Sequence, residues 1–127
     1  MNETKTILVA VNDIFFYTKI RDAFLPAGYT FEKIRNMEGW KEKVLQSKPI
    51  GMIVDMNDDR LNTSDLLKAL KATPETASIR VLSFANHEEI GAWKLAKDLG
   101  IQKVVSRNEF SARTLALFEE ITSPTAS

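Results

Sequence analysis

Short apolar runs alternate along the chain with stretches in which apolar residues recur every three or four positions. The apolar runs predict five strands, at residues 6–11, 30–35, 50–54, 79–84 and 101–105. Runs of this length that are rich in Ile and Val are typical of strands buried on both faces of a parallel sheet. Because a helical stretch follows each run, we expect parallel strands joined by right-handed crossovers, with helices on both faces.

Each of the five predicted helices has a start or stop signal of its own. The predicted N-terminal caps are, in chain order, Asn12-Asp13, Asn36, Thr63 or Ser64, Asn86 with Glu89 three residues later, and Asn108. Pro26-Ala27-Gly28, Lys48-Pro49 and Gly100 are predicted to end the first, second and fourth helices. The side chains at helical spacing, which are predicted to face the core, are Phe16, Ile20, Ala23, Phe24, Trp40, Val44, Leu45, Leu66, Leu67, Leu70, Ala92, Leu95, Ala96, Leu99, Phe110, Thr114, Leu117, Phe118 and Ile121.

The whole pattern predicts one α/β domain over residues 1–122, a three-layer, flavodoxin-like (βα)5 sandwich whose parallel five-stranded sheet has the order 2-1-3-4-5. Residues 123–127 are polar and are expected to form a flexible C-terminal tail. In this order the loops after the first and third strands lie side by side at the topological switch point, where open α/β sheets bind ligands. Functional side chains are therefore expected at the carboxyl ends of the strands.

Composition excludes several classes of function. Lys plus Arg and Asp plus Glu both number 17, so the net charge is zero, which argues against a nucleic-acid binder. The absence of cysteine excludes disulfides and thiolate chemistry, and a single histidine excludes a multi-histidine metal site. The chain has no apolar stretch near the roughly 18 residues of a membrane span and no signal-peptide pattern. We therefore expect a cytoplasmic protein with no membrane partner.

The strongest candidate for chemistry is Asp55, which follows the third apolar run and so is expected at the carboxyl edge of the sheet. The alternative is that Asp55 only caps the next turn. What favours a functional role is that the other strand ends bring further polar residues to the same edge. Asn12, Asp13 and Asn57 are expected within reach of Asp55, and the loops after the fourth and fifth strands bring Ala85, Asn86, His87 and Arg107 to the flank.

Four segments in the order and spacing of residues 7–13, 48–55, 73–81 and 100–108 resemble one known family. The chain, from about Ile7 to Ile121, is similar to the CheY-like receiver domain of bacterial two-component response regulators. The resemblance implies a phosphorelay signalling role and makes Asp55 the phosphoacceptor position. In this family, magnesium neutralises the acceptor carboxylate and the incoming phosphoryl oxygens.

The sequence departs from the family where magnesium is bound, which indicates a degenerate, pseudo-receiver type. Counting back from Gly28, the two acidic positions fall on Val11 and Asn12, and the acid moves to Asp13. Each missing charge matters, because one unit-charge pair at about 4 Å is worth roughly 4 kcal/mol at an effective dielectric of about 20. Asp13 can also cap the first helix, which is the interpretation that we favour. We expect no cofactor, or Mg²⁺ bound weakly by Asn12, Asp13, Asp55 and Asn57.

Other family positions are replaced as well. The hydroxyl position at the end of the fourth strand falls on Ala85, and the aromatic switch position of the fifth strand falls on Val104. The usual route from modification to helix movement is therefore absent. The strand-5 lysine position falls on Arg107, which can pair with Asp55 and hold the edge in a fixed state, or can point to solvent. The sequence leaves both alternatives open.

Two large apolar residues of the fourth helix, Ile90 and Trp93, do not share the spacing of its core-facing stripe. A large apolar residue outside the core indicates a contact surface, so Trp93 is the predicted anchor of a protein interface. The alternative is that Trp93 folds over a neighbouring helix. His87 is expected to be a polar first-turn residue, with a phosphohistidine or proton-switch role as the alternative.

The function expected from these features is a stand-alone receiver-like signalling module, not an enzyme, that acts through protein contacts. Its partner would be a histidine kinase or a second copy of the chain. The alternative is a small-molecule or nucleotide binding module on the same sheet edge. Against this alternative, the loop after the first strand has no glycine to cradle a phosphate, and Asp58 and Asp59 would repel one.

Overall fold

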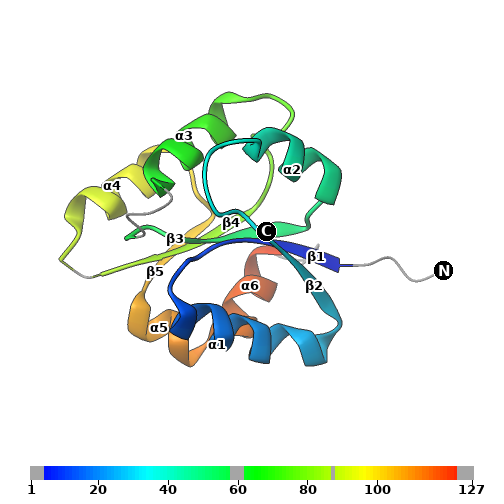
Figure 1. Cartoon of the computed structure of the whole chain (residues 1–127). Coiled ribbons are helices and arrows are strands. Elements are labelled where there is room, and N and C mark those ends of the chain that lie inside the picture. Colours follow the sequence, from blue (N-terminus) through cyan, green and yellow to red (C-terminus); the bar gives the residue numbers. More distant parts are fainter. Residues whose placement is uncertain (1–4, 58–61, 87, 123–127) are drawn as a thin grey trace.

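One parallel sheet with helices packed on both faces forms the fold (Figure 1). The computed structural model describes residues 5–57, 62–86 and 88–122. The strands are β1 (Lys5–Ala10), β2 (Tyr29–Lys33), β3 (Gly51–Asp55), β4 (Val81–Ala85) and β5 (Lys103–Ser106). The helices are α1 (Ile14–Phe24), the short 3-10 helix η1 (Leu25–Ala27), α2 (Trp40–Ser47), α3 (Thr63–Ala72), α4 (Ile90–Asp98), α5 (Arg107–Ala112) and α6 (Thr114–Thr122).

The strand order is β2-β1-β3-β4-β5 and every neighbouring pair is parallel, which confirms the predicted topology. β3 is central and buried along its whole length. Its last residue, Asp55, is in register with Phe84 of β4, and the preceding Val54 is in register with Ala10 of β1. The carboxyl ends of β1, β3 and β4 therefore meet at one edge of the sheet.

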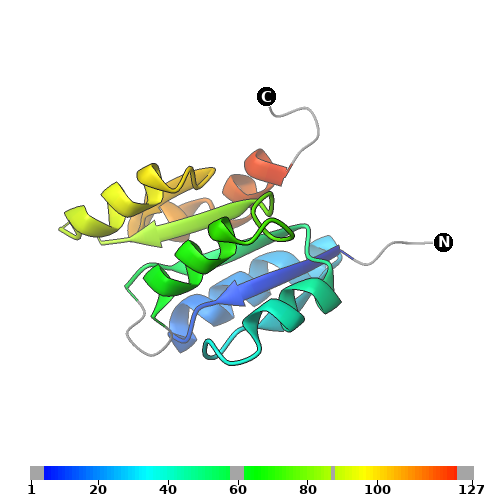
Figure 2. The same ribbon diagram turned by 90° about the horizontal axis from the view of Figure 1, so that it is seen from above.

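Side chains alternate along the strands and build a separate core on each face of the sheet. Helices α2, α3 and α4 cover one face and α1, α5 and α6 cover the other (Figures 1 and 2). The α1 side is rich in aromatic rings and the α3 side in Leu, Val and Met. Gly51 leaves room for the Phe118 ring, because a Cβ at this position would lie 2.7 Å from that ring.

The strands start later than predicted where a turn uses the backbone N–H groups. Ile79 donates its N–H to the Thr76 carbonyl at 3.1 Å, and Ile101 donates its N–H to the Ala96 carbonyl at 3.0 Å. Those N–H groups cannot also join the sheet ladder. β4 and β5 therefore begin two residues after the predicted starts at 79 and 101.

Two predicted helix caps are wrong by one or two residues. The Asn62 side chain, rather than Thr63 or Ser64, caps α3 by accepting a backbone N–H three residues later at 3.3 Å. The Ser106 hydroxyl, rather than Asn108, caps α5 in the same way at 3.0 Å. In both cases the cap is the earlier of two polar residues that lie one or two positions apart, and the sequence pattern does not distinguish between them.

Two other predicted caps do not form. The Asn36 side chain closes a local turn, and α2 begins only after Gly39, whose φ of 70° favours glycine. Leu45 of this helix, predicted to face the core, is 43% exposed. The capping box of Asn86 and Glu89 is absent, and α4 starts without a side-chain cap.

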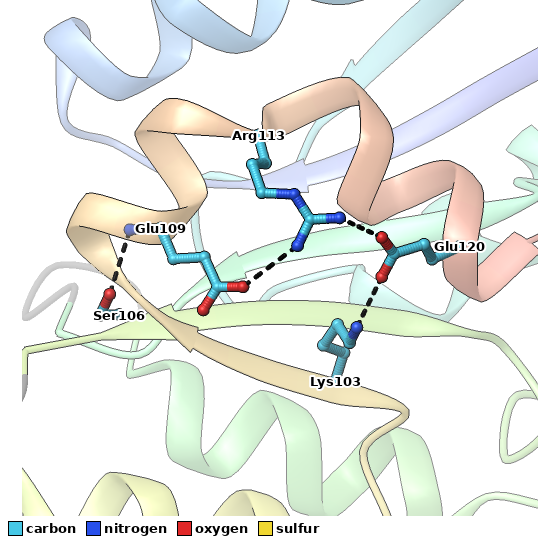
Figure 3. A network of polar contacts seen from close by, with 5 residues as sticks. All are labelled: Lys103, Ser106, Glu109, Arg113 and Glu120. Carbon is cyan, nitrogen blue, oxygen red and sulfur yellow. Dashed lines mark hydrogen bonds and ion pairs between the residues drawn. The ribbon is translucent and has the colours of Figure 1, made fainter.

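The last predicted helix is two helices, α5 and α6, which meet at Arg113 (Figure 3). The Arg113 guanidinium contacts the carboxylates of Glu109 and Glu120, and the Lys103 ammonium of β5 also contacts Glu120 (Figure 3). The hydrogen bond from Lys103, and then Arg113, hold the pKa of Glu120 below its ordinary value. We call these four residues the β5–α6 network, since they tie both helices to the edge strand. The predicted core face of this region is buried throughout, at Phe110, Thr114, Leu117, Phe118 and Ile121.

Some sequence predictions fall outside the described residues: the C-terminal tail at 123–127, His87, and the pair Asp58 and Asp59. They stay predictions. Within the described part of the chain, no helix has both the length and the apolar content needed to cross a membrane.

Candidate functional site

Asp55 lies at the carboxyl end of the central strand, as predicted, and only 3% of its surface is exposed. Its Oδ1 accepts a hydrogen bond from the backbone N–H of Asn57 at 2.9 Å. This bond is the local turn cap that the sequence left open as the alternative. Asp55 therefore has a structural role in this turn in addition to any role in chemistry.

Asp13 caps α1, which confirms the interpretation that we favoured, and it also faces the site. Its Oδ1 accepts the backbone N–H groups of Phe15 at 2.9 Å and Phe16 at 3.3 Å. Val11, where the count from Gly28 placed an acidic family position, is fully buried in the core. Asn12, which lies between Val11 and Asp13 in the sequence, is half-buried. The carboxylate that the first loop brings to the site is therefore that of Asp13.

Arg107, the first residue of α5, bridges the two carboxylates. Its Nη1 lies 3.8 Å from Asp55 Oδ1, and its Nη2 lies 3.5 Å from Asp13 Oδ2. The Arg107 side chain is 26% exposed, so the structure has the paired alternative rather than the solvent-directed one. One guanidinium and two carboxylates leave this group of three side chains with one net negative charge.

Two aromatic rings lie against the Arg107 guanidinium. Its Cζ is 4.4 Å from the ring centroid of Phe16 and 5.8 Å from that of Phe84. Phe84 is itself stacked on Phe110, with centroids 4.3 Å apart. A cation over a ring face gains roughly 0.5 to 2 kcal/mol, more when it is shielded from water. We call Phe16, Phe84 and Phe110 the aromatic shelf, because the three buried rings support the cation.

The loops after β3 and β4 are joined by one side-chain amide. Asn57 Oδ1 accepts the backbone N–H of Asn86 at 2.8 Å, and the Asn86 carbonyl accepts the indole N–H of Trp93 at 2.9 Å. These bonds fix Asn86 in the loop, which explains why it does not cap α4. Trp93 is half-buried against the α3-side core, whereas Ile90 is 77% exposed. Ala85, at the position where the family has a hydroxyl group, carries only a methyl group, and it is fully buried.

Neither a family model nor a curated protein matches the chain, but solved structures match it over nearly its whole length. A phosphorylated cyanobacterial phytochrome response regulator gives a TM-score of 0.80 at 17% identity, covering 98% of both chains. A signal receiver domain from Bermanella marisrubri gives 0.79 at 16% identity, covering 94% of this chain and 98% of that one. A chemotaxis response regulator of Vibrio cholerae gives 0.72 at 15% identity, covering 91% and 98%. The chain has the fold of a response-regulator receiver domain.

The receiver fold implies a magnesium ion beside Asp55, and the donors of this chain do not fit one. Magnesium requires near-octahedral oxygen ligands at about 2.0–2.1 Å. Here Asp13 Oδ1 accepts two helix N–H groups, while Asp13 Oδ2 and Asp55 Oδ1 face the Arg107 guanidinium. Among the residues that the structure describes, no three His, Cys, Asp or Glu side chains gather as a metal-ligand group. In this arrangement the two carboxylates pair with the Arg107 guanidinium instead of a metal ion.

The aromatic shelf is the part of the site that sequence reasoning missed. Helical spacing placed Phe16 in the core, and the apolar run placed Phe84 in the fourth strand, and both placements are right. The available signal was the position of Phe84, next to the end of a strand whose carboxyl edge carries the site. Its contact with Arg107 depends on strand register and on where α5 begins, and neither follows from residue spacing.

Proposed function

We propose that this chain is a receiver-like signalling module of a two-component or phosphorelay system, with Asp55 at the phosphoacceptor position but with an impaired phosphorylation site. The observation that carries the proposal is the buried Asp55 at the switch point of a β2-β1-β3-β4-β5 sheet, paired with Arg107 rather than placed among metal ligands. Both the position of the acid and its partner argue for a receiver that works without magnesium.

Two further features support the impaired site. Oδ1 of Asp13 is used as the cap of α1, so this carboxylate offers only its other oxygen, Oδ2, to the site, where it faces Arg107. Ala85 offers no hydroxyl that could follow a phosphoryl group, so a modification at Asp55 would not move the β4–α4 loop by the family's usual route. The chain would then act as a binding module rather than as an enzyme.

Phosphoacceptance at Asp55 is the direct test of this proposal. We expect wild-type protein treated with a small-molecule phosphodonor and Mg²⁺ to show no stoichiometric mass increase of one phosphoryl group. Intact-mass spectrometry makes the measurement, with Asp55→Asn as the matched control for modification at other side chains. A stoichiometric increase in the wild type that is absent from Asp55→Asn would overturn the impaired site and leave an ordinary receiver.

A module without its own chemistry must act through a partner surface, and the structure supports Ile90 as the centre of one. Ile90 is 77% exposed on α4 and lines an open groove with Trp93, Ile101 and Val104. Trp93 is the weaker choice for a variant, because its indole N–H is bonded to Asn86 and its loss would disturb the loop. The predicted partner is a kinase of the same signalling system or a second copy of the chain.

Replacing Ile90 by Ser should weaken partner binding without weakening the fold, since an exposed side chain contributes little to stability. Light scattering would report self-association, and titration with the cognate kinase would report the other partner. Leu25→Ser is the matched control, because Leu25 is 52% exposed but lies on η1, outside this groove. Equal binding by wild type and Ile90→Ser in both assays would show that the surface is wrong.

Nucleotide binding is less consistent with this edge. The hollow beside Arg107, lined in part by Phe15, Asn86 and Ser111, is open to solvent. The Arg107 guanidinium, which among the described residues is the cation lining this hollow, already faces two carboxylates, and the net negative charge of these three side chains would repel a phosphate.

A further inference from the structure

Arg107 lies where a cation held between Asp13 and Asp55 would have to be placed. We propose that Arg107 is a built-in counter-ion: its guanidinium occupies the place between Asp13 and Asp55 where a cation would bind, and so prevents a divalent metal ion from binding there. The inference rests on the proposed function and specifies how its site is controlled, by the chain itself rather than by magnesium. Removing the guanidinium should therefore expose a latent metal site.

The charges of the three side chains support this assignment. Both carboxylates present an oxygen to the same guanidinium, at 3.5 and 3.8 Å. A divalent cation among these oxygens would lie next to the guanidinium, which repels it. Without Arg107 the edge would carry two negative charges instead of one. Since Asp55 is almost fully buried, the loss of the guanidinium makes its carboxylate a better ligand for another cation.

The aromatic shelf keeps the guanidinium in place. Arg107 lies against the faces of Phe16 and Phe84, and Phe84 is stacked on Phe110 in the core. To leave the site, the side chain would give up these ring contacts together with two ion pairs. The planar guanidinium can stack on rings and bridge carboxylates at the same time, which an ammonium group does less well.

The backbone that carries Arg107 is anchored as well. Ser106 caps α5 directly before Arg107, and the opposite end of this short helix is held by the β5–α6 network (Figure 3). Glu109 belongs both to the cap, through its backbone N–H, and to the network, through its carboxylate. The position of the guanidinium is thus fixed from the ring side and from the backbone side.

Mn²⁺ binding tests the proposal, because Mn²⁺ accepts carboxylate ligands and its free form is measured by electron paramagnetic resonance. We expect no saturable binding by the wild type in the millimolar range. Arg107→Gln should show saturable Mn²⁺ binding, at least about tenfold tighter than the affinity limit that the wild-type titration sets, because the repelling charge is gone. The gain should be lost again in Arg107→Gln/Asp55→Asn. Arg107→Lys keeps the charge but loses the planar group that faces both carboxylates, so its Mn²⁺ affinity should lie between those of the wild type and Arg107→Gln.

Arg21→Gln is the matched control, since it removes an exposed guanidinium of α1 that pairs with Asp22 and takes no part in holding Arg107, and it should gain no Mn²⁺ binding. Cooperative thermal unfolding shows which variants are folded, and Arg107→Met serves as a second neutral variant. Saturable Mn²⁺ binding by the wild type that is lost in Asp55→Asn would overturn the inference. So would the absence of a gain in a folded neutral variant, an outcome that leaves the phosphodonor prediction untouched.

Discussion

Replacing Phe84 by Ala should destabilise the protein by about 3–5 kcal/mol, the usual cost of truncating a phenylalanine in a packed core. Phe84 is fully buried in β4, stacked on Phe110 at 4.3 Å and 5.0 Å from the Phe16 ring. Truncation leaves a cavity between these rings and removes one of the two rings that contact the Arg107 guanidinium. Urea unfolding of wild type and variant, monitored by Trp fluorescence, gives the difference in the free energy of unfolding.

Two variants separate the core role of Phe84 from the general effect of losing a ring. Phe84→Leu keeps most of the apolar volume and should cost clearly less than Phe84→Ala. Phe15→Ala removes a ring that is 63% exposed and should stay within about 0.5 kcal/mol of wild type. Should Phe84→Ala prove no more harmful than Phe15→Ala, the aromatic shelf would not be the packed core that we describe.

The layered parallel sheet follows from the sequence because each apolar run needs burial on both faces, whereas the strand order was expected because five strand–helix units are the size of a flavodoxin-like domain. Ile53 and Leu82 lie on one face of the sheet and Met52 and Val81 on the other, and both faces meet a helix layer. A parallel sheet between two helix layers gives every such strand a cover on each face, and five units are too few for a closed eight-stranded barrel. Element boundaries were harder to predict, as at Ile101, because a single backbone hydrogen bond moves them by one or two residues.

The candidate site was predicted in its members but not in its contacts. Asp13, Asp55 and Arg107 were all placed at the sheet edge by strand order, since that order decides which loops are neighbours. Which of two charged groups pairs with a third depends on side-chain geometry that no spacing rule contains. The choice of Arg107 between Asp55 and solvent was open in the sequence for this reason, and the 3.8 Å contact resolves it.

Replacing Arg107 by Met should have the second largest effect, a loss of about 2 kcal/mol in the free energy of unfolding. Removing one partner of a buried ion pair costs about 3–5 kcal/mol. The cost here is smaller because Arg107 is 26% exposed and Asp13 is 41% exposed, so water partly replaces the lost contact. Methionine keeps an unbranched apolar side chain at this position and removes the guanidinium that lies over the Phe16 ring. The loss would therefore report mainly the removal of the Arg107 guanidinium from the buried Asp55 carboxylate.

A double variant distinguishes this cause from a packing defect. Arg107→Met/Asp55→Asn also removes the negative charge of the Asp55 carboxylate, while the amide oxygen of the substituted side chain can still accept the backbone N–H of Asn57. We expect the double variant to be more stable than Arg107→Met alone, because the buried carboxylate that had lost the Arg107 guanidinium is gone. Arg113→Met, which breaks only the exposed β5–α6 network, should cost no more than about 1 kcal/mol. Failure of Asp55→Asn to restore stability would mean that Arg107 supports the fold by packing, and that charge compensation at Asp55 is a minor part of its role.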